Sequence, residues 1–143
     1  HDGFCHVHKS ILAAELRAAK EAQPDALVLT HPECTQDVVE MSDFVGSTSE
    51  IIDFATESDA KKFIICTEMG VFFELQQKNQ EKKFYSVGHR QFCPNMKKVT
   101  IDKVEAVLNQ LTADGKGVED IVLSDEIIER AGIPLQRMLE LAE

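Results

Sequence analysis

Short apolar segments alternate with helical ones over the first 87 residues, and this alternation limits the possible folds more than any other feature. Apolar segments of strand length lie at 26–30, 43–45, 62–66 and 84–86. Helical patterns lie at about 10–23, with Ser10 as the expected N-cap, and at about 36–42, 47–58 and 71–79. Strands that alternate with helices indicate a parallel sheet covered by helices. We therefore predict an α/β fold, a three-layer α/β/α domain with a short parallel sheet over residues 1–87.

The pattern changes after residue 87, and the second predicted region spans residues 88–143. Its first part, to about residue 98, is irregular and basic and contains Cys93. Helices alone are then expected, at about 100–113, 124–131 and 134–142, with Pro134 starting the last one. A turn at 115–117 and a small edge strand at 118–123 complete this prediction. The region is thus a cysteine loop and a helical segment without a sheet of its own.

Charge and composition exclude several classes of partner. Hydrophobic residues make up 43% and charged residues 28%, which is typical of a globular protein. The net charge of −10 disfavours binding to nucleic acid, and no apolar run approaches the roughly 20 residues of a membrane span. We expect no nucleic-acid or membrane partner. Four cysteines without a signal-peptide pattern indicate a reducing, cytoplasmic location.

The four cysteines differ in their surroundings. None belongs to a CxxC pair, which argues against a zinc-ribbon or thioredoxin-like site. Cys66 ends an apolar segment, and we expect it to be buried and inert. Cys5 and Cys93 lie in polar segments and are the better candidates for metal ligands. The surroundings of Cys34 are intermediate between the apolar ones of Cys66 and the polar ones of Cys5 and Cys93.

Polar residues follow each of the first three predicted strands directly. These segments are His-Pro-Glu-Cys at 31–34, Gly-Ser-Thr-Ser at 46–49 and Thr-Glu-Met-Gly at 67–70. Ligands of open α/β sheets bind outside the carboxyl ends of the strands, where such segments meet. Glu33 is a candidate general base there, and His31 a candidate proton donor or carboxylate ligand. His8, three residues after Cys5, is a candidate ligand or acid–base group.

The segment at 46–49 has two interpretations, which the sequence leaves open. Ser47 and Glu50 have the spacing of a capping box, which requires only the start of a helix. The free N–H groups of that helix start, with the Thr48 and Ser49 hydroxyls, also suit a carboxylate or phosphate.

Taken together, these motifs resemble those of the quinolinate synthase family. The resemblance is carried in order by residues 4–8 (FCHVH), 31–34 (HPEC), 46–49 (GSTS), 67–70 (TEMG) and 93–96 (CPNM), and by the closing residues 133–139 (IPLQRML). It implies three similar α/β/α domains around a central active site. It also implies a four-iron, four-sulfur (4Fe-4S) cluster on three cysteines, and condensation of iminoaspartate with dihydroxyacetone phosphate to quinolinate for NAD biosynthesis.

The same resemblance assigns roles to individual residues. It implies that Cys5 and Cys93 are cluster ligands, whereas Cys34 and Cys66 match no ligand position. Glu33, His8 and His31 correspond to active-site residues, with Glu33 as the acid–base group. Ser47 and Thr48 correspond to binders of a substrate carboxylate or phosphate, and Met96 to a residue that lines the pocket.

The first part of the family pattern, with the third cysteine, is absent from these 143 residues. We expect the chain to be a C-terminal half that is inactive alone, with the N-terminal half as its partner. The helical region 88–143 is expected to complete another domain in the family fold. L-aspartate oxidase or aspartate dehydrogenase would supply iminoaspartate.

Two alternatives remain at the level of the sequence. One is a zinc-dependent hydrolase or zinc-binding domain that uses Cys5, His8, His31 and Cys34, since zinc accepts such nitrogen and sulfur ligands. The other is a non-catalytic α/β domain that binds a small anion at 47–49.

Overall fold

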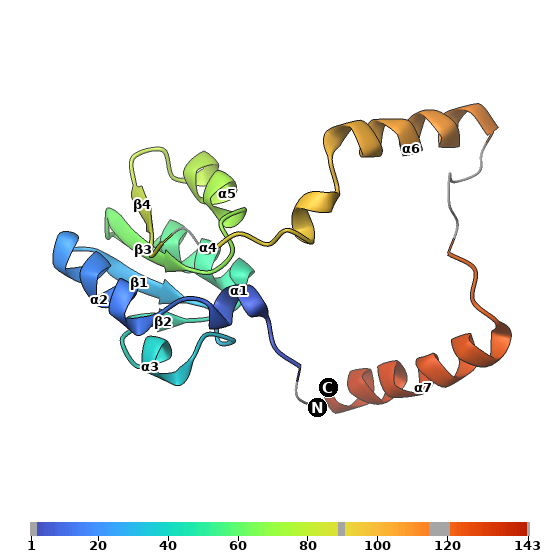
Figure 1. Cartoon of the computed structure of the whole chain (residues 1–143), viewed down its shortest axis with the longest axis horizontal. Coiled ribbons are helices and arrows are strands. Elements are labelled where there is room, and N and C mark those ends of the chain that lie inside the picture. The colour runs from blue at the N-terminus through green and yellow to red at the C-terminus, as the bar shows by residue number, and fades with distance from the viewer. Residues whose placement is uncertain (1–2, 89–90, 115–120, 143) are drawn as a thin grey trace. The chain divides into compact units, whose positions relative to one another are not determined.

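A computed structural model describes residues 3–88, 91–114 and 121–142 (Figure 1). The chain divides into two compact units, His1–Lys97 and Lys98–Glu143, which are described separately below. The first unit holds the whole sheet and the cysteine loop. The second unit is helical.

The sheet of the first unit has four parallel strands. These are β1 (Leu27–Thr30), β2 (Phe44–Val45), β3 (Lys62–Cys66) and β4 (Lys83–Ser86), in the order β2-β1-β3-β4. Thr30 at the end of β1 lies opposite both Val45 and Cys66. The carboxyl ends of β1, β2 and β3 are therefore level, and the polar segments that follow them begin at one edge. The predicted parallel α/β architecture is confirmed.

Helices cover both faces of this sheet (Figure 1). One face packs against α2 (Ala13–Ala22) and α3 (Gln36–Val39), and the other against α4 (Thr48–Glu57) and α5 (Val71–Lys78). The short helix α1 (His6–Lys9) precedes α2. The strands supply alternate side chains to the two sides, with Ile64 facing α2 and α3, and Phe63 and Ile65 facing α4 and α5. Full burial of such a side chain stabilises the fold by about 1.5–3 kcal/mol. The two cores hold the central strands, and thereby their carboxyl ends, in fixed positions.

The start of the first unit differs from the sequence prediction. Ser10 was expected to cap a helix beginning there, but it instead ends the short helix α1, where its hydroxyl donates to the carbonyl of Val7 at 2.8 Å. The following helix, α2, begins at Ala13 without a side-chain cap. The capping prediction for Ser10 is therefore wrong, because a serine hydroxyl can bond a carbonyl at a helix end as readily as an N–H at a helix start.

The second unit contains α6 (Ile101–Asp114) and α7 (Asp125–Ala142), preceded by a 3₁₀ turn at Met96–Lys98. Two helices separated before Pro134 were expected, but α7 is one helix that continues through Pro134, so this prediction is wrong. Proline removes one N–H donor, and the remaining hydrogen bonds keep this 18-residue helix continuous. The predicted turn at 115–117 and residues 118–120 of the predicted edge strand lie outside the described residues, whereas 121–123 form no strand.

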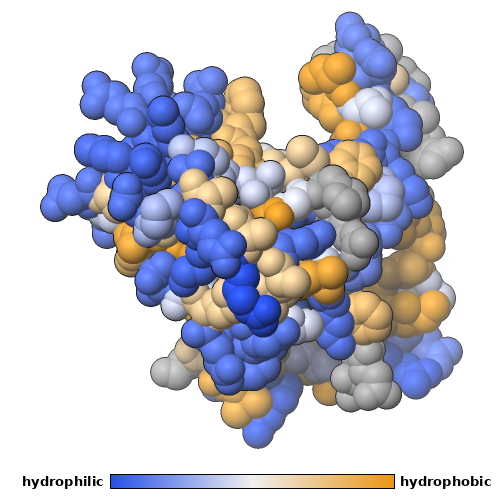
Figure 2. All heavy atoms as spheres, turned by 60° about the vertical axis from the view of Figure 1, so that its left-hand side comes forward, coloured by the Kyte–Doolittle hydropathy of each residue, from blue (hydrophilic) through white to orange (hydrophobic). Residues whose placement is uncertain are grey.

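The surface is largely polar. Figure 2 shows hydrophilic side chains over much of one face, with smaller hydrophobic areas between them. Large apolar side chains of α6 and α7, such as Leu108 and Leu139, are more than half exposed. No helix in the described part of the chain combines the length and the apolar character needed to cross a bilayer.

Candidate functional site

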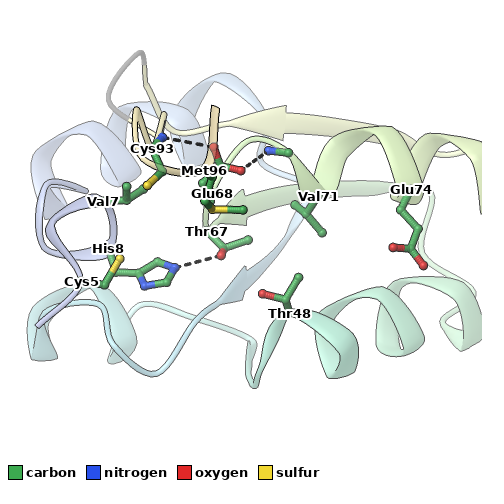
Figure 3. A pocket seen from close by; sticks show the side chains of 11 residues that line it. Cys5, Val7, His8, Thr48, Thr67, Glu68, Val71, Glu74, Cys93 and Met96 are labelled. Carbon is green, nitrogen blue, oxygen red and sulfur yellow. Dashed lines mark hydrogen bonds between the residues drawn. The ribbon is translucent and has the colours of Figure 1, made fainter. Parts of the chain in front are cut away.

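The candidate site lies where the sheet order changes direction along the chain. After β1 the chain adds β2 on one side, and then crosses back to place β3 on the other side. Such a change of direction opens a crevice at the carboxyl ends of the two central strands. A cavity of about 350 Å³ occupies this edge, and Figure 3 shows the side chains that line it. Its lining includes Cys5, His8, Thr48, Cys93 and Met96.

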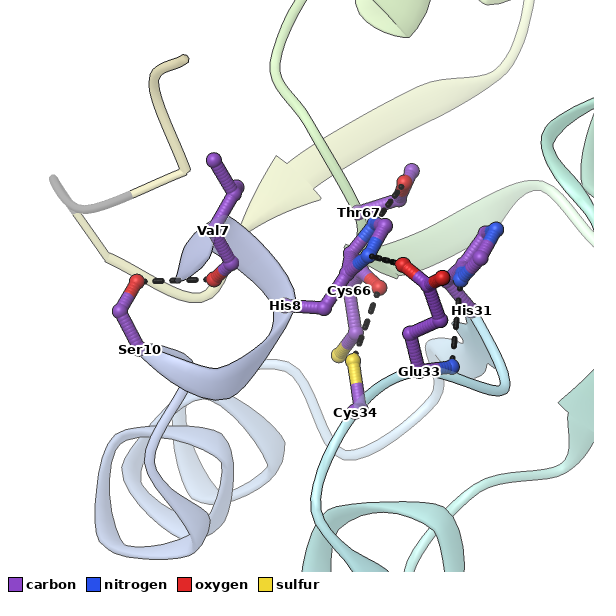
Figure 4. Close-up of polar contacts among 8 residues, drawn as sticks. All are labelled: Val7, His8, Ser10, His31, Glu33, Cys34, Cys66 and Thr67. Carbon is purple, nitrogen blue, oxygen red and sulfur yellow. Dashed lines mark hydrogen bonds and ion pairs between the residues drawn. The ribbon is translucent and has the colours of Figure 1, made fainter. Parts of the chain in front are cut away.

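His8 connects the segments that follow β1 and β3. Its Nδ1 lies 3.0 Å from Oε2 of Glu33, and its Nε2 lies 3.0 Å from Oγ1 of Thr67 (Figure 4). A carboxylate can only accept, so Nδ1–H donates to Glu33, and Nε2 shares a hydrogen bond with the Thr67 hydroxyl. His8 and Thr67 are buried, whereas the Glu33 side chain is 54% exposed. The exposed carboxylate is thus held by a buried, oriented imidazole.

His31 packs flat against His8. The ring centroids are 4.0 Å apart and the planes differ by 5°. The backbone N–H of Glu33 donates to Nδ1 of His31 at 3.2 Å, so the neutral ring carries its proton on Nε2. Burial, followed by the neighbouring His8, lowers the pKa of His31, although Glu33 acts in the opposite direction. A neutral His31 with an Nε2–H directed away from the Glu33 backbone can donate to a ligand (Figure 4).

Cys5, His8 and Glu33 also form a group with metal-binding potential. One sulfur, one ring nitrogen and one carboxylate oxygen lie within 4.8 Å of one another. This group differs from the zinc alternative derived from the sequence. His31 stacks on His8, and the Cys34 thiol is buried and directed at the carbonyl of Cys66 at 3.5 Å. Neither His31 nor Cys34 belongs to the group, so the predicted four-residue zinc set is not assembled.

Two side chains, the buried Gln91 and the partly buried Glu68, hold the Cys93 loop against β3. The Gln91 side chain donates to the carbonyls of Ile65 and Thr67 at 2.7 and 2.6 Å, and accepts from the N–H of Val87 at 2.8 Å. Glu68 accepts from the N–H of Cys93 at 3.2 Å (Figure 3). These contacts bring Cys93 to the same cavity as Cys5.

Glu68 is an ionised anchor. Burial acts to raise the pKa of its carboxyl, but hydrogen bonds from the N–H groups of Gly70 and Cys93, and the Lys97 ammonium, outweigh burial and lower it. Lys97 lies 3.1 Å from the carboxylate. The negative charge next to Cys93 is therefore balanced within the loop itself.

The other two cysteines are separated from this cavity by burial. Cys34 and Cys66 are 8% and 0% exposed and belong to the core between the sheet and α2. Burial, with Cys66 as the next cause, raises the pKa of Cys34 to about 12. Burial raises the pKa of Cys66 to about 11. Burial of Cys66 was predicted and is confirmed.

The segment at 46–49 starts α4, as the sequence indicates. The Ser47 hydroxyl accepts from the N–H of Glu50 at 3.4 Å, and the Glu50 carboxylate accepts from the N–H of Ser47 at 2.7 Å. The predicted capping box is thereby confirmed. Thr48 lines the cavity, whereas Ser47 is not among its lining residues. The helix start thus reaches the cavity through Thr48.

The structure brings most of the predicted residues together and adds three that were missed. Cys5, His8, Thr48, Cys93 and Met96 line one cavity, and His31 and Glu33 contact His8 beside it. Thr67, Glu68 and Gln91 were missed as contributors. The position of Thr67 and Glu68 directly after a strand was the available signal for these two residues. Gln91 gave no such signal, because it lies in an irregular stretch.

Comparison with known proteins identifies the family of this chain. Residues 1–140 match the family model described as quinolinate synthetase A protein. The chain belongs to the quinolinate synthetase A family. It is 48% identical over 141 residues to a protein named quinolinate synthase from Caldicellulosiruptor saccharolyticus, covering 99% of this chain and 45% of that protein.

Other members of the quinolinate synthetase A family give the same result. Proteins named quinolinate synthase from Caldicellulosiruptor bescii and Clostridioides difficile are 46% and 39% identical, over 98% and 99% of this chain. The chain covers 44% and 45% of those two proteins. It thus spans less than half the length of the curated relatives that it matches, and its membership of an enzyme family for NAD biosynthesis is established.

Proposed function

We propose that this chain forms part of the active site of a quinolinate synthase. The reaction condenses iminoaspartate with dihydroxyacetone phosphate and releases quinolinate, one phosphate and two waters. The observation that carries the proposal is the meeting of Cys5, Cys93 and the His8–Glu33 pair at one cavity, in a chain of this family. The location of the protein is proposed to be cytoplasmic.

Cys5 and Cys93 are proposed as two ligands of a 4Fe-4S cluster. Iron–sulfur clusters are held by cysteine thiolates, and these two thiols are partly exposed at one cavity, which fits that requirement. Cys34 and Cys66 do not fit it, because both are buried with raised pKa values. With a third cysteine from the remaining length of the protein, these residues would hold a cluster with one iron open to substrate, which would supply Lewis-acid chemistry.

Glu33 is proposed to move protons in the condensation and the dehydrations. Its exposed carboxylate can reach a ligand in the crevice, and the hydrogen bond from His8 fixes its orientation. His8 is itself fixed by Thr67. Glu33 can therefore take up a substrate proton on Oε1 and return it to a leaving hydroxyl, while the Nδ1–H of His8 keeps its hydrogen bond to Oε2 and holds the carboxylate in place.

Substrate binding is assigned to Ser47, Thr48, His31 and Met96. Thr48 and the first N–H groups of α4 suit the phosphate or a carboxylate, because a helix start attracts anions. The Ser47 hydroxyl accepts within the capping box and can still donate its own proton. The Nε2–H of His31 supplies a further donor for a carboxylate. Met96 provides an apolar wall.

The remaining length of the protein is proposed as the essential partner of this chain. Only two candidate cluster cysteines are present here, so we expect the isolated chain to form no quinolinate and to hold no stable cluster. L-aspartate oxidase or aspartate dehydrogenase is the proposed source of iminoaspartate.

Replacement of Glu33 by glutamine in the full-length protein tests the catalytic assignment. Quinolinate formation from iminoaspartate and dihydroxyacetone phosphate should fall about 100-fold or more, which is typical for loss of a general acid–base group. The matched control is Glu21→Gln, an exposed glutamate on α2, which should keep the wild-type rate. A wild-type rate for Glu33→Gln would contradict the assignment and favour the non-catalytic anion-binding alternative.

A further inference from the structure

Cys5, His8 and Glu33 can serve a second metal chemistry that needs no other part of the protein. They offer one thiolate, one imidazole and one carboxylate, with ligand atoms within 4.8 Å of one another. Zinc accepts all three donor types, and three protein ligands are the usual number where a fourth position stays open. An iron–sulfur cluster, in contrast, is held mainly by thiolates.

We propose that this group binds one zinc ion, independently of any iron–sulfur cluster. The distance between Nδ1 of His8 and Oε2 of Glu33 is 3.0 Å. Two atoms that share a tetrahedral zinc ion at bond lengths of about 2.0 Å are roughly 3.3 Å apart. Zinc can therefore displace the proton from Nδ1 with little movement of either side chain. The ring then carries its one proton on Nε2, which lies 3.0 Å from Oγ1 of Thr67 and can donate to it.

Cys5 is placed to complete the set. It is the N-cap residue of α1 and lies three positions before His8, so both side chains belong to the same helical turn. No capping hydrogen bond engages the Cys5 side chain. The thiolate is thus able to approach the ion by rotation of its side chain.

Thr67 supplies the outer contact that zinc-bound histidines require. A metal-bound histidine normally donates its second N–H to an oxygen, which fixes the ring. Here Nε2 of His8 lies 3.0 Å from Oγ1 of Thr67, and both residues are buried. The Glu33 side chain is 54% exposed, so solvent can reach the carboxylate end of the group. Because Cys5 is also a proposed cluster ligand, zinc and cluster exclude each other in one molecule.

Titration of the metal-free 143-residue chain tests this proposal. Cobalt(II) is added as a spectroscopic substitute for zinc, and zinc is then added to displace it. We expect one ion per chain and a thiolate-to-cobalt charge-transfer band. Cys5→Ser, His8→Gln and Glu33→Gln should each weaken zinc binding about 100-fold or more, and Thr67→Val about tenfold, the scale of an outer-contact loss. Among these variants, only Cys5→Ser should abolish the thiolate-to-cobalt charge-transfer band. Circular dichroism of that variant checks that the chain is still folded.

Matched controls separate this site from the proposed cluster site. Cys93→Ser changes a cysteine that lines the same cavity but lies outside the ligand group. His6→Gln changes an exposed histidine of α1, and Glu21→Gln changes an exposed glutamate of α2. Each should bind zinc within about twofold of the unmodified chain. Absence of zinc binding overturns the proposal. The proposal is also overturned if Cys93→Ser loses as much zinc affinity as Cys5→Ser, or if Glu33→Gln binds zinc as tightly as the unmodified chain.

Discussion

The four cysteines form two chemically different pairs. Cys5 and Cys93 are partly exposed at the cavity, whereas Cys34 and Cys66 lie in the core with pKa values of about 12 and about 11. The thiolate, and not the thiol, is the nucleophile and the metal ligand. The environment of each cysteine therefore selects the pair that is available for metal binding.

Thiol alkylation of the metal-free chain at pH 8 measures this difference. The ordinary cysteine pKa of 9.0 is raised in both buried thiols. A raised pKa reduces the thiolate fraction at pH 8 about tenfold per unit, or roughly 1,000-fold for Cys34 and 100-fold for Cys66. Cys5 and Cys93 should react first, and the other two only after denaturation. Mass spectrometry of partly labelled protein reports the order; early labelling of Cys34 would contradict it.

Contacts between distant residues were the part of the site that the sequence could not provide. His8 and Glu33 are 25 positions apart, and His8 and Thr67 are 59 apart. The sequence predicted that His8, His31 and Glu33 would gather at one sheet edge, because residues that follow parallel strands meet there. Their pairing depends on the strand order and on the side-chain packing, which no local pattern contains.

At the scale of elements, the Cys93 loop depends on a single buried side chain. Gln91 is 2% exposed and bonds two carbonyls at the end of β3 and the N–H of Val87. Met69 also donates through its N–H to the carbonyl of Gln91 at 2.7 Å. The loop that carries Cys93 is thus tied to the end of β3 and to the segment with Thr67 and Glu68 that follows it.

Replacement of Gln91 by leucine should destabilise the first unit by about 2–4 kcal/mol, because each buried polar group left without a partner costs about 1–3 kcal/mol. Denaturant unfolding of the chain measures this loss. Gln77→Leu, at an exposed position on α5, is the matched control and should change the free energy of unfolding by less than about 0.5 kcal/mol. Equal stability of the two variants would show that Gln91 does not anchor the loop.

The strands were predictable because each is a short apolar run bounded by polar residues, and the sheet they form fills two hydrophobic cores. Two of the errors concern helix ends. Helix α1 is only four residues long, so its periodicity cannot be recognised, and the role of Ser10 was misassigned as a result. Pro134 was taken as a helix boundary, but α7 continues through it.

At the scale of the whole molecule, the chain supplies a parallel sheet whose carboxyl edge carries candidate cluster ligands and acid–base groups. Its relatives are more than twice as long, since it covers 45% of the Caldicellulosiruptor saccharolyticus protein. The central claim is that Cys5 and Cys93 hold an iron–sulfur cluster together with a cysteine from the remaining length.

The iron content of the full-length protein, purified without oxygen, tests this claim most directly. Cys5→Ser and Cys93→Ser should each lose the cluster iron, because each removes a proposed thiolate ligand. Cys34→Ala should keep the iron of the unmodified protein, because its thiol lies buried in the core and alanine preserves a small apolar side chain there. Unchanged iron in Cys5→Ser and Cys93→Ser, or a loss confined to Cys34→Ala, would contradict the account.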